Sequence, residues 1–198
     1  VLMFNNITRY NKKTLWTHTN VASVDIRDNV GLEMPDGNIK INMPSLLYIH
    51  LGNNSQSIQA VRFDKTKFPV LVDLYLNGNR LSSFPDESLK DSLMYLGMAR
   101  CHLNSLPVYL SRFHSLKYLD VRDNNISIVD TQIKKLINDN KIESYFAGNS
   151  VCNGDTELDC TPLCSKYCWS RTESSNGRCA ATCNSEQCEY DGGDGRIK

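Results

Sequence analysis

One spacing of residues recurs along most of the chain and limits what the chain can fold into. An apolar residue is followed three positions later by Asn or Cys, and two positions after that by a second apolar residue, as in Leu76, Asn79 and Leu81. The motif returns every 22 to 25 residues. A period of this length indicates a repeat architecture in which each copy stacks on the next. The other copies, some complete and some worn, are centred on Asn5, Asn29, Asn54, Cys101, Asn124 and Asn149.

Two leucines precede the best copies, such as Leu71 and Leu74 before Leu76. With them, the spacing resembles that of leucine-rich repeat proteins over residues 1–151. The resemblance implies an α/β solenoid of about seven turns, with parallel strands on a concave face and short helices or turns on a convex face. Residues 1–151 are therefore expected to form one domain.

The chemistry of the motif agrees with this fold. Alternate residues around Leu74 and Leu76 would point inward from a short strand. A buried Asn amide at the following turn can pair with backbone groups that would otherwise be orphaned in the core. Cys101 occupies the same position, so we expect a buried and unpaired thiol there.

The repeat register places the remaining strand residues in two columns on the concave face. Tyrosines alternating with acids suit a binding surface for a protein or glycan, because tyrosine combines a large contact area with a polar tip. We expect these side chains to be exposed, so that replacing Tyr95 or Tyr118 weakens partner binding and leaves stability nearly unchanged. The alternative is that such residues are ordinary strand composition. One column holds Tyr48, Asp73, Tyr95 and Tyr118, and the other holds Asp25, His50, Tyr75, Gly97, Asp120 and Tyr145.

Cysteines are distributed unevenly, and they mark a second region. Only Cys101 lies before residue 152, whereas seven cysteines lie between Cys152 and Cys188. Such density is typical of a disulfide scaffold in an oxidising compartment, with zinc binding as the alternative. Cys152 and Cys160 are the natural pair for a cap that closes the last repeat, so residues 152–163 are predicted to be a cap and linker.

The spacing of the remaining cysteines, together with the motifs Cys183-Asn184 and Tyr190 to Asp194, resembles the Lin-12/Notch repeat, an extracellular module with three disulfides and a calcium ion. The resemblance covers residues 164–195. It implies pairing of Cys164 with Cys188 and of Cys168 with Cys183. Gly195 stands where the family has its sixth cysteine, which leaves Cys179 without the expected partner.

The same resemblance implies a calcium site. Asp191 and Asp194 flank two glycines, and carboxylate oxygens are ligands that calcium prefers. By the family's pattern, Glu173 and Asn176 add further oxygens. The alternatives are a plain acidic turn and a zinc site made of thiolates.

Three glycosylation sequons agree with a secretory location, at Asn6, Asn53 and Asn125. Each asparagine is the neighbour of a motif asparagine, so alternation would point it outward. The chain begins at Val1 without a signal peptide, and we expect it to be the middle of a longer protein.

Charge and composition argue against other classes of protein. The 22 basic and 22 acidic residues cancel and form no block of like charge, which is unlike a nucleic-acid-binding protein. No apolar run approaches the roughly 18 to 20 residues of a membrane helix. Neither metal spacing nor a nucleophile motif accompanies the four histidines, so we expect no enzyme.

The predicted function is extracellular recognition of a protein or glycan, with the cysteine-rich tail as a cap and a calcium-stabilised spacer. Two alternatives remain. The chain would be an intracellular scaffold if its tail cysteines were reduced or bound zinc. The tail would mask a cleavage site if it acted as it does in Notch receptors, although it is a single copy.

Overall fold

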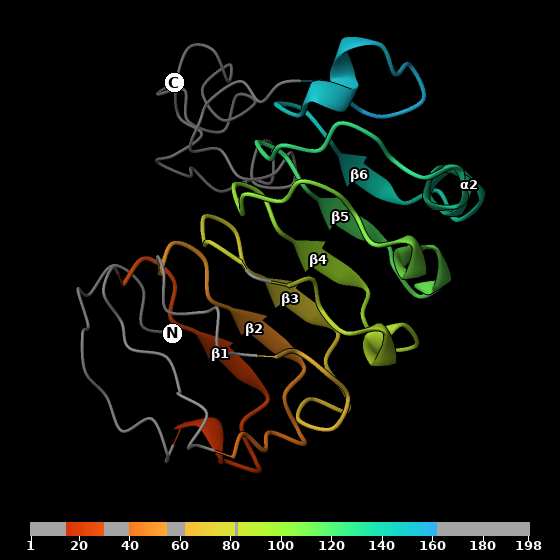
Figure 1. Ribbon diagram of the computed structural model, residues 1–198. Helices are drawn as coiled ribbons and strands as arrows, with labels where there is room; N and C mark the ends of the chain where they lie inside the picture. Colours follow the sequence, from red (N-terminus) through yellow and green to blue (C-terminus); the bar gives the residue numbers. More distant parts are fainter. Residues whose placement is uncertain (1–14, 30–39, 55–61, 82, 162–198) are drawn as a thin grey trace, which may run out of the picture. The chain divides into compact units, whose positions relative to one another are not determined.

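The computed structural model describes residues 15–29, 40–54, 62–81 and 83–161. The chain divides into two compact units, Val1–Cys160 and Thr161–Lys198, and all the described elements belong to the first. This unit contains a parallel sheet of six strands in sequence order, each only three residues long (Figure 1). The strands are β1 (Ser23–Asp25), β2 (Tyr48–His50), β3 (Asp73–Tyr75), β4 (Tyr95–Gly97), β5 (Tyr118–Asp120) and β6 (Glu143–Tyr145).

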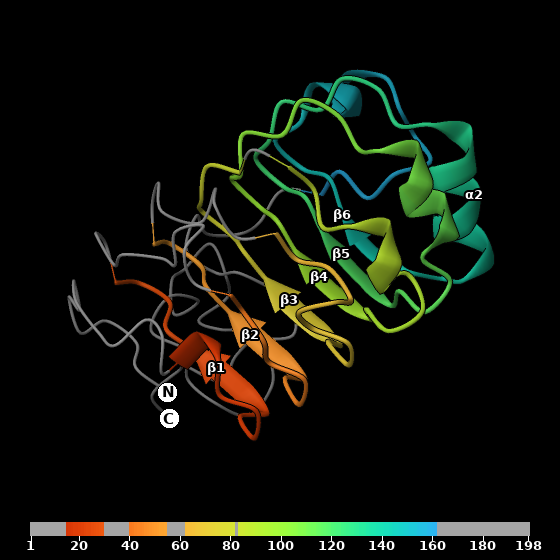
Figure 2. The same cartoon turned by 60° about the horizontal axis from the view of Figure 1, so that its bottom comes forward.

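Helical segments return the chain from one strand to the next in the second half of the unit, on the far side of the core from the sheet (Figure 2). Their starts follow local rules: Asp86 and Asp130 cap two of them by accepting hydrogen bonds from the backbone N–H of Ser88 and Gln132. The segments between successive strands are η2 (Glu87–Leu89), η3 (Val108–Arg112) and α2 (Thr131–Asp139), whereas η4 (Ser150–Asn153) follows the last strand.

The core lies between the sheet and these return segments. The central residue of strands β2 to β5 is fully buried, at Ile49, Leu74, Leu96 and Leu119. Side chains alternate along a strand, so the first and third residues of each strand point away from this core. The fold is thus α/β with a parallel sheet, an arrangement compatible with the expected solenoid.

Buried asparagine amides join neighbouring strand-to-turn segments, as their spacing predicts. Asn79 accepts from the backbone N–H of Asn54 at 3.0 Å and donates to the carbonyls of Leu51 and Leu76 at 2.8 Å each. Asn124 and Asn149 make equivalent bonds two and three copies further on. These amides satisfy backbone groups that no strand pairs.

Cys101 takes the same position with a thiol. It is buried and not disulfide-bonded, and its Sγ donates to the carbonyl of Leu76 at 3.2 Å. Burial raises the pKa of this thiol to about 12. It is therefore a structural residue of the turn, as expected for a cysteine in an asparagine position.

A left-handed backbone conformation precedes each of these turn residues. Glycine takes it at Gly78 and Gly148, with φ of 72° and 78°. A Cβ at Gly78 would lie 2.0 Å from Oδ1 of Asn53, so glycine is required there by space as well as by backbone conformation. The same conformation is taken by other residue types at Asp28, Asn53, Arg100 and Asp123.

The last strand is covered by the loop that a disulfide closes. Cys152 and Cys160 are bonded, with their Cα atoms 5.7 Å apart. Within the loop, Leu158 enters the hydrophobic core, and the carbonyl of Asp159 accepts from the backbone N–H of Phe146 at 2.8 Å. This loop therefore belongs to the sheet unit and shields the edge next to β6.

Candidate functional site

The outer sheet face is the surface made by the first and third residues of the six strands. Strand register places Tyr48, Asp73, Tyr95 and Tyr118 side by side in one column. The second column runs through Asp25, His50, Tyr75, Gly97, Asp120 and Tyr145. The structure thus brings together all seven residues that the sequence assigned to partner binding.

Aromatic rings on this face form a continuous series of contacts. Tyr75 lies 5.4 Å from the ring of His50, 6.0 Å from Tyr48 and 6.4 Å from Tyr118, measured between ring centroids. Tyr118 in turn lies 6.5 Å from Tyr95 and 5.7 Å from Tyr145. These separations are those of favourable aromatic pairs, so the rings support one another as well as a ligand.

The expectation that all the side chains of the two columns are exposed was wrong for four of them. Asp120 is fully buried, and Tyr145, Tyr118 and Asp25 are only 4%, 6% and 8% exposed. Three neighbouring rings cover Tyr118, and its pKa is raised, chiefly by burial. The expectation that replacing Tyr118 would leave stability unchanged is withdrawn for the same reason. Tyr95, at 37% exposed, remains accessible.

Asp120 is buried in an ion pair with Arg122, which the sequence analysis did not single out. The Arg122 guanidinium donates from Nε to Oδ1 at 2.8 Å and from Nη2 to Oδ2 at 2.6 Å. It also lies 5.2 Å from the ring centre of Tyr145. Arg27 and Asp25 form a similar pair at 3.3 Å. An arginine two residues after an aspartate of the second column was the available signal.

Gly97 explains how Tyr75 reaches across the face. A Cβ at Gly97 would lie 2.6 Å from Cδ1 of Tyr75, so the Tyr75 ring covers the space that a side chain at residue 97 would fill. This allows Tyr75 to contact Tyr118, two strands away. The glycine is in the predicted column, but spacing alone did not reveal its role.

Burial also controls the titration of His50 and Tyr75. The pKa of His50 is lowered to about 3, mainly by burial and then by the charge of Arg27. Its Nδ1 lies 3.2 Å from the hydroxyl of Tyr48. The pKa of Tyr75 is raised, first by burial and then by Asp73. At neutral pH both groups are uncharged hydrogen-bonding partners, and the charge of the face comes from its carboxylates and arginines.

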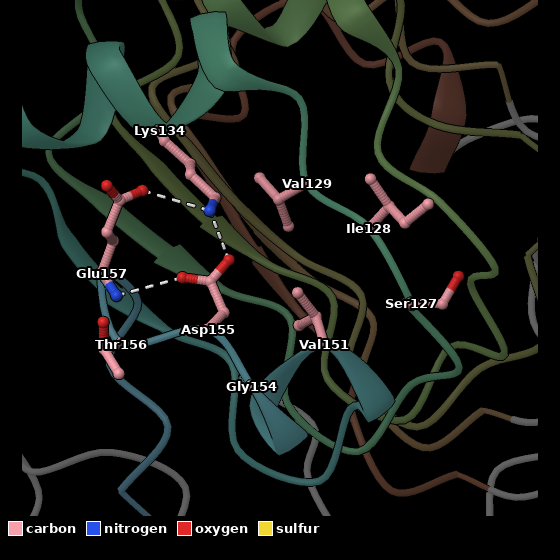
Figure 3. Close-up of a pocket in the computed structure, with 9 residues that line it drawn as sticks. All are labelled: Ser127, Ile128, Val129, Lys134, Val151, Gly154, Asp155, Thr156 and Glu157. Carbon is pink, nitrogen blue, oxygen red and sulfur yellow. Dashed lines mark hydrogen bonds and ion pairs between the residues drawn. The ribbon is translucent and has the colours of Figure 1, made fainter.

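A pocket of about 450 Å³ lies between residues 127–129, α2 and the disulfide loop (Figure 3). Its apolar wall includes Ile128 and Val129, and its polar wall includes Lys134, whose Nζ pairs with Asp155 and with Glu157. These charges are compensated within the pocket. The ion pairs join α2 to the disulfide loop, which gives them a structural role.

The predicted glycosylation sites differ in accessibility. Asn125 is exposed and donates to Asn104 at 3.1 Å. Asn53 is half-buried, and its Nδ2 donates to Asp28 at 2.7 Å, so a glycan there would have to break that bond. Asn6 lies outside the described residues.

The predicted tail site also lies outside the described residues. This applies to the calcium ligands Asp191, Asp194, Glu173 and Asn176, to the paired cysteines Cys164, Cys188, Cys168 and Cys183, and to Cys179. Within the described ranges, no group of three His, Cys, Asp or Glu side chains is placed to bind a metal ion. The described part of the chain also includes no helix with the length and apolar character needed to cross a membrane.

Comparison with known families supports the tail resemblance. The family model for the LNR domain of Notch matches residues 158–195. The match begins just before Cys160 and includes the five cysteines from Cys164 to Cys188. No curated protein matches the chain. The tail is thus similar to an LNR domain, a module that is typically extracellular and known to bind calcium.

Proposed function

We propose that this chain is part of an extracellular protein that binds another protein, or a glycan, through the outer sheet face. The series of tyrosine contacts across five strands, β2 to β6, is the observation that carries the proposal. Rigid aromatic side chains provide contact area at a small cost in conformational entropy. Their mutual packing holds them in place before a ligand arrives, which reduces that cost further.

We also propose that the sheet unit is a leucine-rich repeat solenoid. Support comes from one strand and one asparagine or cysteine turn in each copy, with strands paired in sequence order. Neighbouring copies contact one another and little else, as in repeat proteins. Such a fold presents a regular surface, and its role here is binding and not catalysis.

An extracellular location is supported by three independent features. The Cys152–Cys160 disulfide requires an oxidising compartment to persist. The LNR match covers a module of that compartment. Asn125 offers an exposed sequon.

The tail acts in this proposal as a spacer that calcium stabilises. Asp191 and Asp194 would hold the ion, helped by Glu173 and Asn176. The donor set is chemically suitable, because hard oxygen ligands select calcium over softer metals. A module of this size has few apolar residues, so cross-links and metal replace a core.

A binding screen tests the function. The full chain, secreted from cells and presented as a multivalent probe, would be applied to panels of purified ectodomains and glycans. We expect Tyr95→Ala to weaken a specific interaction at least tenfold, while Val108→Ala, an exposed position in η3 away from the face, leaves it unchanged. A partner that both variants bind equally well would place recognition elsewhere and refute the proposal.

A further inference from the structure

We propose that the outer sheet face binds an arginine side chain of its partner protein, with the guanidinium paired to the carboxylate of Asp73 among tyrosine rings. This inference rests on the proposed function and specifies the chemistry of that surface. It assigns one occupant to one place on the face.

Asp73 lies at the centre of the aromatic series. Its neighbours in the first column are Tyr48 and Tyr95, and Tyr75 follows on the same side of the same strand. Tyr75 is close enough to Asp73 for the carboxylate to raise its pKa. A cation bound to Asp73 would therefore have ring faces or edges on three sides.

The other strand carboxylates on this face already have partners. Asp25 pairs with Arg27, and Asp120 pairs with Arg122. Glu143 accepts a hydrogen bond from the hydroxyl of Tyr145. Among the described residues, Asp73 has neither a hydrogen bond nor an ion pair to its side chain. It contributes an uncompensated negative charge in the middle of the surface.

This carboxylate is also partly removed from water. Burial raises the pKa of Asp73, and no donor offsets that effect. A group that has lost hydration without gaining a partner is a favourable position for an incoming cation, because the cost of desolvation is already met by the fold. Charge complementarity therefore selects a basic side chain.

Arginine is favoured over lysine by an arrangement on the same face. Arg122 binds Asp120 through two N–H groups while its guanidinium lies 5.2 Å from the ring of Tyr145. A planar guanidinium can pair with a carboxylate and stack on an aromatic ring at the same time, which a compact ammonium does less well. Asp73 provides the carboxylate of such a site, and the neighbouring tyrosines provide the rings. Residue 75 lies two positions after Asp73, as Arg122 does after Asp120, but it is a tyrosine instead of an arginine.

The first experiment titrates residues 1–198 with N-acetyl-arginine methylamide, with its lysine analogue and with the neutral citrulline analogue, following tyrosine ring resonances by NMR. We expect the arginine probe to bind at least tenfold more tightly than the citrulline probe, with the largest shifts at Tyr48, Tyr75 and Tyr95. Asp73→Asn should reduce arginine binding at least tenfold. Asp91→Asn, an exposed aspartate outside the face, is the matched control and should not. Equal binding of the two probes, equal effects of the two variants, or tighter binding of the lysine analogue would overturn the proposal.

Near-UV circular dichroism of Asp73→Asn shows whether the tyrosine series is intact, so that lost binding is not misread as lost structure. For a partner found by screening, unchanged affinity with Asp73→Asn but weakened affinity with Tyr95→Ala would refute this inference and leave the function standing. Arginine binding at Asp73 without any Tyr95-dependent partner would instead refute the function. A dimer of this chain that Asp73→Asn dissociates would overturn the assignment, because the occupant would be a second copy.

Discussion

The buried pair of Asp120 and Arg122 allows a quantitative test of the face. Their side chains are 0% and 3% exposed, and two charge-assisted hydrogen bonds of 2.8 and 2.6 Å join them. Asp120→Asn keeps the shape of the side chain but leaves the guanidinium buried without a counter-charge. Breaking one side of a buried ion pair costs about 3 to 5 kcal/mol. For a unit of this size, that corresponds to a fall of roughly 6 to 20 °C in melting temperature.

Equilibrium unfolding in guanidinium chloride, followed by far-UV circular dichroism, measures this cost. The double variant with Asp120→Asn and Arg122→Met removes the orphaned charge, so we expect it to be more stable than Asp120→Asn alone. Asp91→Asn controls for loss of an exposed carboxylate and should change stability by less than about 0.5 kcal/mol. A cost below about 1 kcal/mol for Asp120→Asn would show that the pair is not a coupled buried unit. The same conclusion would follow if the stability loss of the double variant equalled the sum of the losses of Asp120→Asn and Arg122→Met alone.

The other predictions concern the core, titration, the buried thiol and the metal. Leu96→Ala should lose about 2 to 5 kcal/mol of stability by opening a cavity, whereas Tyr95→Ala in the same strand should lose less than about 1 kcal/mol; similar losses in chemical unfolding would contradict the assignment of faces. His50 stays neutral in the folded state to about pH 3, but in the unfolded chain it takes up a proton near pH 6.5. Stability should therefore fall with decreasing pH between these values, by up to about 1.4 kcal/mol per pH unit, and unfolding curves of His50→Gln should lack this contribution. Burial and the raised pKa of Cys101 predict no reaction with a maleimide until the protein is unfolded; rapid labelling of native protein at this residue, found by peptide mapping, would contradict its burial. Calcium should bind the full chain in isothermal titration calorimetry and Asp191→Asn should weaken that binding at least tenfold; no heat of binding for the wild type would refute the tail site.

Sequence patterns predicted the parts of the fold that depend on spacing. The asparagine positions located each turn, because only a buried polar side chain that bridges copies explains their recurrence, and Asn79 and Asn124 make the bonds that this role requires. The period of two in the strands then fixed which residues share the outer face. Both results follow from rules of local geometry that act within one copy and its neighbour.

The same rules could not predict how outward-pointing side chains cover one another. Tyr118 points away from the core and is still buried, because Tyr75 leans across Gly97 to meet it. Arg122 follows the strand, and its guanidinium turns back to Asp120 and lies over the ring of Tyr145, which belongs to the next strand. Such burial depends on contacts between side chains of different strands, so the alternation of residues within one strand does not predict it.

The loop between Cys152 and Cys160 closes one end of the stack of strands, the end at β6. The carbonyl of Asp159 occupies the hydrogen-bonding position that a seventh strand would take beside Phe146. An uncovered strand edge is a template on which other chains can add and aggregate. The disulfide holds this cover in place together with Leu158 in the core and the ion pairs of Lys134. A thiol reductant should therefore loosen the cover and make the edge of β6 more accessible to strands of other molecules.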